Sequence, residues 1–320
     1  MDRKIKLAVV GVGNCASSLI QGIEYYKDAG DDESIPGLMH ANFGGYHIRD
    51  IEIVAAFDVN ADKVGRDVAE AIYVAPNNTT VFARVPTTGV PVQKGPRLDG
   101  VNKYTAELVP VDDAQPPVDV VAALKAAGAE IVVNYLPVGS TLATEFYANA
   151  AIEAGCGFVN CIPVFIASND AWAQKFADAG LPVIGDDIKA QVGATILHRT
   201  LTNLFLDRGM RIDHTYQLNT GGNTDFLNML ERERLADKKT SKTEAVTSMI
   251  EARGQTIAPE DIHIGPSDYV PWQKDNKICF LRIESTHFGG VPMNLEVRLW
   301  SLRSSSASSP RSIPASRPRT

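Results

Sequence analysis

The sequence of 320 residues lacks the marks of several specialised protein classes. Its four cysteines form neither a C-x-x-C pair nor a disulfide framework, so a reduced, cytoplasmic protein is expected. Cys15, which lies in a glycine-rich stretch, is interpreted as a small packing residue and not as a nucleophile. No apolar run approaches the roughly 18 residues of a membrane span. The first four residues lead directly into a β-type segment, so neither a signal peptide nor a membrane partner is predicted.

Basic residues are also too few to dominate the surface, because the net charge is −7. A nucleic-acid-binding protein would carry a basic surface, so no nucleic-acid partner is predicted. No group of histidines and cysteines has zinc-ligand spacing, and no internal repeat is present. The remaining composition, 44% hydrophobic and 22% charged, is that of a soluble globular protein long enough for about two domains.

The most informative stretch is KLAVVGVGNCASSL, residues 6–19. An apolar β-type run leads into a G-V-G turn, and apolar residues then recur at helical spacing. In the resulting G-x-G-x-x-A pattern Gly11 permits the turn, Gly13 admits a pyrophosphate and Ala16 lets the helix pack closely on the strand. The helix N-terminus offers free N–H donors to the phosphates. We therefore predict that a dinucleotide binds at residues 11–16.

A second β-type run, residues 51–57, ends in Asp58, the position at which such folds hold the adenosine ribose. The usual gap between the glycines and this acidic residue is about 20 residues. Here residues 25–50 lengthen the gap and are interpreted as an insertion over the first crossover. Two interpretations of Asp58 stay open: a ribose ligand, or a cap of the turn that ends the strand.

Strands and helices alternate as far as residue 185, apart from a proline-rich, irregular stretch at residues 75–115. The predicted strands cover residues 130–135, 157–160 and 181–185, and the predicted helices cover residues 118–127, 141–154 and 171–179. This alternation predicts an α/β fold with a Rossmann-like, doubly wound parallel sheet, which binds ligands at the carboxyl ends of its strands. Several polar residues lie at these ends and are candidates for a shared site: Asp58, Asn134, Ser140, Asn160, Asp186 and Asp187.

The pattern changes after Asp187. A helix is predicted over residues 188–206, with Lys189 in its first turn. A cation there opposes the helix dipole, which suggests a functional reason for the lysine; an ordinary aspartate cap beside a solvated lysine is the alternative. Strands follow at residues 212–218, 278–283 and 294–299, which predicts a second, α+β domain with an open, largely antiparallel sheet.

Two further stretches carry chemistry. Asn219 begins a polar, glycine-rich segment, NTGGNTD, which is interpreted as a turn whose backbone N–H groups could cradle a phosphate. The segment KKTSK, residues 238–242, follows closely and holds three lysines. These are candidates for binding anions and for stabilising an oxyanion, and a solvated helix face is the alternative.

These motifs together resemble the myo-inositol-1-phosphate synthase family, also called inositol-3-phosphate synthase, in its shorter actinobacterial form. The resemblance extends from residue 6 to residue 299 and is carried by stretches such as VVGVGNCASSLIQGIEYY, NYLPVGS, GDDIKAQVGAT, LNTGGNTDFLNML and VPMNLEVRL. GDDIK combined with NTGGNTDFLNM is its most specific feature. It implies an isomerase that converts glucose 6-phosphate to 1D-myo-inositol 3-phosphate, the first step of inositol and phospholipid biosynthesis. The implied route is oxidation with tightly bound, recycled NAD, then enolisation, intramolecular aldol cyclisation and reduction.

The resemblance also implies roles for individual residues. The implied catalytic residues are Lys189, Lys239, Lys242, Asp187, Asp268 and Lys277. The implied cofactor contacts are Gly11, Gly13, Asn14, Cys15, Ala16, Asp58, Asn134, Pro137, Gly139, Ser140 and Asp186, and the implied substrate-phosphate contacts are Asn219, Gly221, Gly222 and Asn223. Larger relatives carry a second lysine soon after the GDDxK lysine, whereas QVGAT follows here. The resemblance implies a homotetramer and leaves open whether a divalent or monovalent cation is required.

The predicted domains are residues 1–187, binding NAD, and residues 188–299, for catalysis and oligomerisation. Residues 300–320 are rich in Ser, Pro and Arg, and we expect them to be disordered and the family's C-terminal segment to be missing. Weak or absent activity is therefore expected. The alternative functions are an NAD-dependent dehydrogenase that releases NADH and a non-enzymatic NAD-binding protein or inactive synthase.

Overall fold

A computed structural model describes residues 4–188, 190–231 and 236–302, without the side chains of residues 236–242, 245, 266, 267 and 302. The contacts divide the described residues into two compact units, which are residues 4–188 and residues 190–302.

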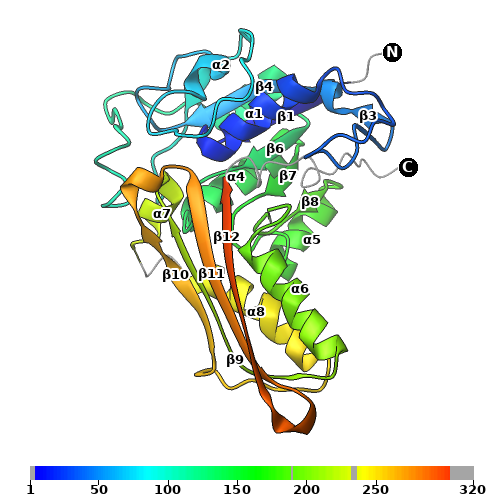
Figure 1. Ribbon diagram of the computed structural model, residues 1–320. Helices are drawn as coiled ribbons and strands as arrows, with labels where there is room; N and C mark the ends of the chain where they lie inside the picture. Colours follow the sequence, from blue (N-terminus) through cyan, green and yellow to red (C-terminus); the bar gives the residue numbers. More distant parts are fainter. Residues whose placement is uncertain (1–3, 189, 232–235, 303–320) are drawn as a thin grey trace. The chain divides into compact units, whose positions relative to one another are not determined.

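The first unit is built on a six-stranded sheet (Figure 1). Its strands are β1 (Ile5–Val10), β4 (Ile51–Asp58), β5 (Val92–Lys94), β6 (Ile131–Asn134), β7 (Gly157–Asn160) and β8 (Val183–Ile184). The order is β5-β4-β1-β6-β7-β8, and every neighbouring pair is parallel. Because the first strand lies in the middle and later strands add on both sides, the sheet is doubly wound, and the predicted fold class is confirmed.

Helices cover both faces of this sheet. They are α1 (Asn14–Tyr26), α2 (Val68–Ala71), α3 (Val120–Ala127), α4 (Thr141–Ala154) and α5 (Asp170–Asp178). Ala8 and Val10 pack in a core with residues of α3, α4 and α5. Leu7 and Val9 point the other way and pack with α1. Strand residues alternate between faces, so a continuous apolar run such as that of β1 fits a strand that is buried on both sides.

Residues 25–50, predicted as an insertion, carry a short hairpin and little other regular structure. The hairpin pairs β2 (Asn42–Phe43) with β3 (Tyr46–His47), and the 3-10 helix η1 (Ile48–Asp50) follows. Leu38, Ala41 and Ile48 form a small core there, against which Ile23 and Tyr26 of α1 pack. The insertion therefore adds a satellite core beside the first helix and leaves the parallel sheet uninterrupted.

The second unit has a four-stranded sheet in the order β10-β9-β11-β12. The strands are β9 (Arg211–Gly221), β10 (Ile262–Tyr269), β11 (Asn276–Thr286) and β12 (Pro292–Leu302). β10 is parallel to β9, and the other two pairs are antiparallel, as predicted for an open, largely antiparallel sheet. The remaining elements are α6 (Ala194–Asp207), α7 (Thr224–Asn228), α8 (Ala236–Glu251), η3 (Pro271–Gln273) and η4 (Phe288–Gly290).

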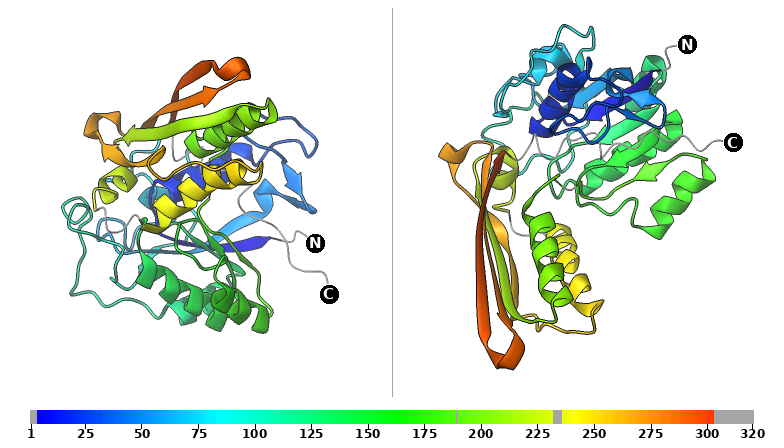
Figure 2. Two further views of the ribbon diagram at one scale, coloured as in Figure 1. Left: turned by 90° about the horizontal axis from the view of Figure 1, so that it is seen from below. Right: turned by 45° about the vertical axis from the view of Figure 1, so that its right-hand side comes forward.

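Helices α6 and α8 cover one face of this sheet (Figure 2). Phe205 of α6 and Ile250 of α8 pack there against Leu281 and Ile283 of β11. On the other face Leu218, Phe280 and Trp300 are exposed within the chain. The sequence pattern thus alternates between a helix-covered core and an uncovered surface.

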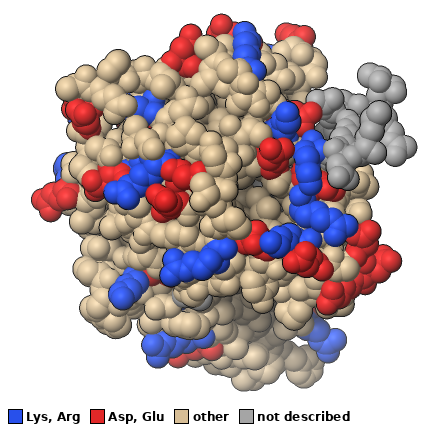
Figure 3. Space-filling view, turned by 90° about the horizontal axis from the view of Figure 1, so that it is seen from above, with Lys and Arg blue, Asp and Glu red and all other residues tan. Residues whose placement is uncertain are grey.

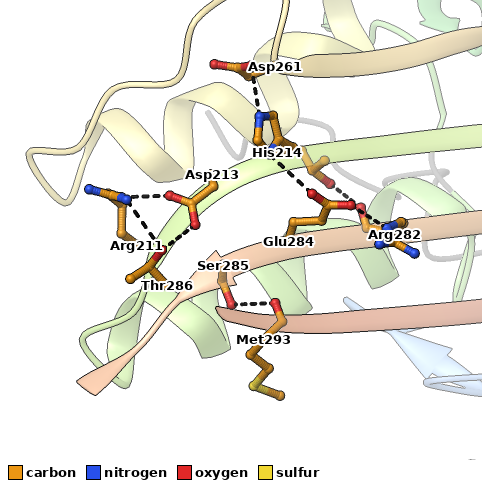
Figure 4. Close-up of polar contacts among 10 residues, drawn as sticks. Arg211, Asp213, His214, Asp261, Arg282, Glu284, Ser285, Thr286 and Met293 are labelled. Atoms are coloured by element: carbon orange, nitrogen blue, oxygen red, sulfur yellow. Dashed lines mark hydrogen bonds and ion pairs between the residues drawn. The ribbon is translucent and has the colours of Figure 1, made fainter. Parts of the chain in front are cut away.

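Polar contacts on the uncovered face fix the register of the strands near the start of β9 and the end of β11 (Figure 4). The imidazole of His214 lies between carboxylates of Asp261 and Glu284, at 3.3 Å from each. Arg282 Nε donates to Glu284 at 2.6 Å, and Arg282 also bonds Glu296 on β12. These pairs link three adjacent strands and the loop before β10, so a slip of one residue would separate opposite charges.

Two strand boundaries differ from the predictions. β10 was not predicted, because Gly265 and Pro266 inside it favour a loop; the structure accommodates them where the register with β9 shifts between Ile264 and Ser267. β12 extends to Leu302, and Trp300 pairs with Ile278, so the expectation that disorder begins at residue 300 is wrong for residues 300–302. The rest of the predicted tail, residues 303–320, lies outside the described residues.

No described helix is both long and apolar enough to cross a membrane. On the face drawn in Figure 3, acidic and basic side chains are interspersed over a largely uncharged surface.

Candidate functional site

The glycine loop joins β1 to α1 and has the geometry that a dinucleotide requires. Gly11 has φ of +84°, and a Cβ there would lie 2.8 Å from the carbonyl oxygen of Tyr135, so only glycine fits. Gly13 has an ordinary φ of −91° and is the N-cap of α1. A Cβ at Gly13 would meet no atom within 4 Å. The first glycine is therefore needed by the chain, whereas the second leaves space beside the helix N-terminus, as a bound pyrophosphate would need.

Asp58 holds this loop from the end of β4. Its Oδ2 accepts a hydrogen bond of 2.7 Å from the Val12 N–H. Its Oδ1 accepts from the N–H groups of Val59 and Asn60, at 2.7 and 2.9 Å. A carboxylate offers about four acceptor sites, so one is left for a ribose hydroxyl. The turn-capping interpretation describes the structure, and the ribose contact stays a prediction.

Replacing Asp58 with asparagine should destabilise the first unit even without a ligand. The asparagine amide has one oxygen and one NH₂ group, so the NH₂ must face at least one of the backbone N–H donors. A buried donor left without an acceptor costs about 1–3 kcal/mol, which should lower the Tm by roughly 3–10 °C for a unit of this size. Calorimetry of the ligand-free protein measures this change.

Asp62→Asn is the matched control, because the Asp62 side chain is exposed and lies in the same turn. Its Tm should stay within about 2 °C of the wild type. An Asp58→Asn variant with an unchanged Tm would contradict the role of Asp58 in holding the loop.

Segments far along the chain brace the same loop and were missed by sequence reasoning. Lys63 Nζ donates to the Val12 carbonyl at 2.8 Å. The side chains of Asn14 and Asn78 are hydrogen-bonded to each other at 2.9 Å. A lysine in a turn is normally exposed to solvent, so the sequence gave no sign that Lys63 is buried against the loop. The Asn77-Asn78-Thr79 run was a visible polar cluster within the stretch predicted to be irregular.

A chain of polar side chains crosses the carboxyl ends of β6, β7 and β8. Asn134 Nδ2 donates to Asn160 Oδ1 at 2.9 Å, and Asn160 Nδ2 donates to Asp186 Oδ1 at 2.7 Å. The Asp186 carboxylate also accepts from the backbone N–H groups of residues 166, 167 and 168. The structure therefore contradicts a cofactor-contacting role for the Asp186 side chain, because four donors occupy its oxygens. It instead shapes the loop after β7.

The loop between β6 and α4 was also predicted to contact the cofactor. Gly139 has φ of +81°, and the buried Ser140 hydroxyl donates to the Pro137 carbonyl at 2.6 Å, so these three residues form a closed turn. Asp99 caps the start of α4, accepting from the N–H groups of Leu142 and Ala143. A carboxylate of the chain itself thus occupies the start of α4, whereas no side chain caps the start of α1.

The segment around Lys189 is not the start of a helix. The N–H groups of Asp187 and Ile188 donate to carbonyls of Ile162 and Cys161, at 3.1 and 3.2 Å, and so tie this segment to the loop after β7. Helix α6 begins only at Ala194. The predicted start of this helix at residue 188 is therefore wrong, and the dipole argument, which assumed that start, loses its basis. Asp187 has φ of +59°, an unfavourable conformation for aspartate that is often found at functional sites. Lys189 itself lies outside the described residues.

In the second unit, the predicted phosphate-binding turn is largely strand. Asn219 and Gly221 pair with Cys279 and Lys277 of β11. The Gly222 N–H donates to the Lys274 carbonyl at 2.9 Å, and a Cβ at Gly222 would lie 2.4 Å from the Val270 carbonyl oxygen. The Gly222 N–H is thus unavailable to a phosphate, and this glycine allows two backbone segments to approach closely.

The Asn223 side chain is likewise hydrogen-bonded to other residues of the chain. Its Oδ1 accepts from the N–H groups of Asp225 and Phe226 as the N-cap of α7, and its Nδ2 donates to the buried Asp275 carboxylate at 2.8 Å. The side chain keeps one Nδ2 hydrogen beyond these bonds, so its predicted substrate contact stays a prediction. Asn219 is 2% exposed, and neither its Oδ1 nor its Nδ2 has a hydrogen-bond partner among the described residues. Of the four predicted phosphate contacts, Asn219 thus keeps side-chain groups that could bind a ligand.

The predicted catalytic residues of the second unit lie at one end of its sheet. Asp268 pairs with Thr220, and Lys277 pairs with Gly221. Adjacent residues of a strand point to opposite faces, so the register puts Lys277 on the face of Asn219 and Asp268 on the uncovered face. The side chains of Lys239 and Lys242, on α8, lie outside the described residues. Within the described part of the chain, no group of three His, Cys, Asp or Glu residues could hold a metal ion.

A buried histidine lies on the helix-covered face of the same sheet. His198 of α6 is fully buried, and its Nε2 lies 2.8 Å from Thr215 Oγ1. The Thr215 hydroxyl donates its hydrogen to the Arg282 carbonyl, so it accepts from His198, whose proton is therefore on Nε2. Burial lowers the pKa of His198 from 6.5 to about 4. His198 is thus neutral at pH 7.

His198 should make the second unit sensitive to mild acid. Because its folded pKa is lowered, its stabilising contribution is complete above pH 6.5 and is lost as the pH falls toward 4. The loss amounts to roughly 3 kcal/mol. Urea unfolding at pH 7.5 and pH 4.5 should show a smaller pH difference for His198→Asn, whereas His263→Asn, at an exposed position, should keep the wild-type difference. Equal differences for all three proteins would contradict this assignment.

Comparison with known proteins identifies the family. The family model described as myo-inositol-1-phosphate synthase matches residues 193–302. A protein of Mycolicibacterium smegmatis named inositol-3-phosphate synthase is 57% identical over 297 residues, which are 92% of this chain and 82% of the relative. The chain belongs to the myo-inositol-1-phosphate synthase family. The family model lies within the second unit, but the 297 matched residues are far more than that unit contains, so the match to the synthase relative also covers most of the first unit.

Two solved structures extend the synthase comparison to the fold. The crystal structure of Ari2 superposes with a TM-score of 0.76 at 33% identity, covering 95% of this chain and 83% of the other. An inositol-3-phosphate synthase of Caenorhabditis elegans superposes with a TM-score of 0.73 at 16% identity, covering 96% and 73%. The second likeness is one of fold alone. The predicted family resemblance is confirmed, and it applies to both units.

Proposed function

We propose that this chain is an inositol-3-phosphate synthase, which converts glucose 6-phosphate to 1D-myo-inositol 3-phosphate. The observation that carries the proposal is a dinucleotide loop of the required shape in a chain 57% identical to a protein with that name. The product would enter inositol and phospholipid biosynthesis. Cytoplasmic localisation is part of the proposal and is supported by the four cysteines, none of which forms a disulfide.

The residues of the first unit fit NAD. The open space at Gly13, the amino end of α1 and the remaining acceptor site of Asp58 match a pyrophosphate followed by a ribose. NAD bound there would accept a hydride from the substrate and return it, so that no net redox change occurs. We propose that it is bound tightly and recycled in the site.

The chain's own lysines would handle protons and negative charge. Oxidation at C5 of the sugar acidifies the adjacent C6 position, and both ketone formation and enolisation develop negative charge on oxygen. An ammonium group beside that oxygen stabilises the charge, and a neutral lysine Nζ can take a proton. We assign these roles to Lys189 and to Lys239 or Lys242, and we assign Asp187 and Lys277 as further catalytic residues. Asp268 is the weaker assignment, because the register puts it on the other face of the sheet from Lys277.

One assay separates the proposed reaction from that of an ordinary dehydrogenase. Purified protein is incubated with glucose 6-phosphate and a catalytic amount of NAD. The synthase forms inositol phosphate with no lasting rise in absorbance at 340 nm, whereas a dehydrogenase accumulates NADH in proportion to product. Absence of inositol phosphate, or a stoichiometric rise in NADH, would contradict the proposal. Repeating the assay after chelation and with different monovalent salts tests for a cation requirement.

We also propose a homotetramer that uses the uncovered face of the second sheet. Leu218, Phe280 and Trp300 expose apolar surface there, and a partner subunit would remove this surface from water. Light scattering on the purified protein measures the subunit number. A monomer at micromolar concentration would contradict this part of the proposal.

A further inference from the structure

Lys63 is a charged residue with almost no exposure to solvent. It lies in the turn after β4, and only 3% of its surface is accessible. Its Nζ donates to the Val12 carbonyl at 2.8 Å and to Asn77 Oδ1 at 2.9 Å. Burial lowers the pKa of Lys63, and the nearby charge of Asp58 opposes that shift. An ammonium is costly to bury, so a lysine in this place calls for a local reason.

Lys63 and Asp58 hold the two ends of one residue. The Val12 N–H donates to Asp58, and the Val12 carbonyl accepts from Lys63 and, at 3.1 Å, from Asn77 Nδ2. Val12 lies between the two glycines of the loop. The Asp58 carboxylate thus binds the N–H of Val12, and the Lys63 ammonium binds its carbonyl. Together they fix the orientation of the peptide groups on both sides of Val12.

The residue on the other side of Gly13 is fixed as well. Asn14 Oδ1 accepts from the Asn78 N–H at 2.8 Å, and the Asn14 carbonyl accepts from the Thr79 hydroxyl at 3.2 Å. Hydrogen bonds thus hold both neighbours of Gly13, Val12 and Asn14, while the space beside the Gly13 Cα is open. A loop held in this way presents its shape to a ligand before the ligand arrives.

We propose that Lys63 is a positioning residue for NAD: by holding the Val12 carbonyl, it keeps the glycine loop in the conformation that receives the pyrophosphate. Preorganisation of a binding loop raises affinity, because the ligand then does not have to order the loop itself. The proposal rests on the proposed function in that NAD is taken as the bound dinucleotide. The alternative is that Lys63 stabilises the first unit as a whole and has no specific effect on the loop.

Two variants separate the hydrogen bond from the charge. Lys63→Met replaces the apolar stem of the side chain and removes both the hydrogen bond and the charge, whereas Lys63→Gln keeps an N–H donor without the charge. Lys125→Met, on the exposed side of α3, is the matched control. Calorimetric titration with NAD and with ADP-ribose gives the affinities, and hydrogen exchange of the ligand-free proteins reports on the peptide that covers residues 11–14.

For Lys63→Met we expect the Kd for both ligands to rise at least tenfold, because both contain the pyrophosphate. Exchange over residues 11–14 should become at least tenfold faster, while peptides from β6 and α4 keep their wild-type protection. Lys63→Gln should fall between Lys63→Met and the wild type, and Lys125→Met should match the wild type. Asn77→Ala removes a partner of Lys63 and of Val12, and should reproduce a smaller version of both effects if Lys63→Met does not fold.

Three results would overturn the proposal. The first is an NAD affinity of Lys63→Met within threefold of the wild type together with unchanged exchange of the loop. The second is faster exchange throughout the first unit, which would assign Lys63 to general stability. The third is unchanged loop exchange in Asn77→Ala where Lys63→Met is unfolded. A wild-type protein that binds neither ligand would contradict the proposed function, and the exchange measurement would still decide whether Lys63 orders the loop.

Discussion

Replacing Gly13 with valine is expected to abolish NAD binding and to leave the fold intact. The Cβ position at Gly13 is open, and its φ of −91° and ψ of −161° are extended backbone that valine adopts readily. The isopropyl group would fill the space assigned to the pyrophosphate. Losing the contacts of that group should weaken NAD by at least about 100-fold, which corresponds to roughly 3 kcal/mol. Titration with NAD and thermal unfolding without NAD measure the two expectations.

Gly22→Val is the matched control, because it makes the same change in α1 at a position where a Cβ also meets no atom within 4 Å. It should bind NAD like the wild type. Gly11→Ala gives the opposite pattern: its φ of +84° and the nearby Tyr135 carbonyl predict a lower Tm in the ligand-free protein. NAD binding by Gly13→Val with wild-type affinity would place the pyrophosphate elsewhere.

Replacing Lys189 with alanine is expected to remove turnover without lowering the Tm. Because α6 starts only at Ala194, the change alters neither a helix terminus nor its dipole. The residues just before Lys189 are held by backbone hydrogen bonds to Ile162 and Cys161, which the substitution leaves unchanged. Losing a group that stabilises an oxyanion or transfers a proton typically slows a reaction by about 10²–10⁴-fold. Inositol phosphate formation at saturating NAD measures the loss.

The Lys189→Ala experiment has an internal check. NAD affinity should stay within about threefold of the wild type, because Lys189 is assigned to the sugar and not to the dinucleotide loop. Lys125→Ala, at an exposed position, should retain full turnover. Parallel losses of Tm and turnover in Lys189→Ala would assign the residue to the fold, and wild-type turnover would remove it from the mechanism.

The elements that sequence reasoning placed correctly are those whose ends carry local signals. Helix α4 runs from Thr141 to Ala154, as predicted, and Gly155 ends it in the left-handed conformation. The glycine turn after β1 was equally readable, since Gly11 and Gly13 differ from their neighbours in what their backbone permits.

The errors arise where distant segments decide the structure. Asn219, Thr220 and Gly221 read as a turn, but β10 and β11 pair with them on both sides and extend the strand. Ile188 was predicted to start a helix, but its N–H donates to the carbonyl of Cys161, in the loop after β7. Asp186 read as a ligand because it is polar and follows a strand, and the family resemblance implied a substrate contact for Asn223. Their partners, Asp275 and residues 166–168, could not be inferred from local spacing.

The glycine loop is short, but the residues whose contacts shape it are far from it in the sequence. Val12 reaches Asp58 across 46 residues and Lys63 across 51, and Asn14 reaches Asn78 across 64. Contacts between such separated segments form only after the intervening chain has folded back. During synthesis, a nascent chain of about 60 residues would already contain the whole glycine motif, yet the groups that hold Asn14 would still be untranslated. The contacts that shape the loop can therefore be complete only after residue 79 of the 320 residues has been made.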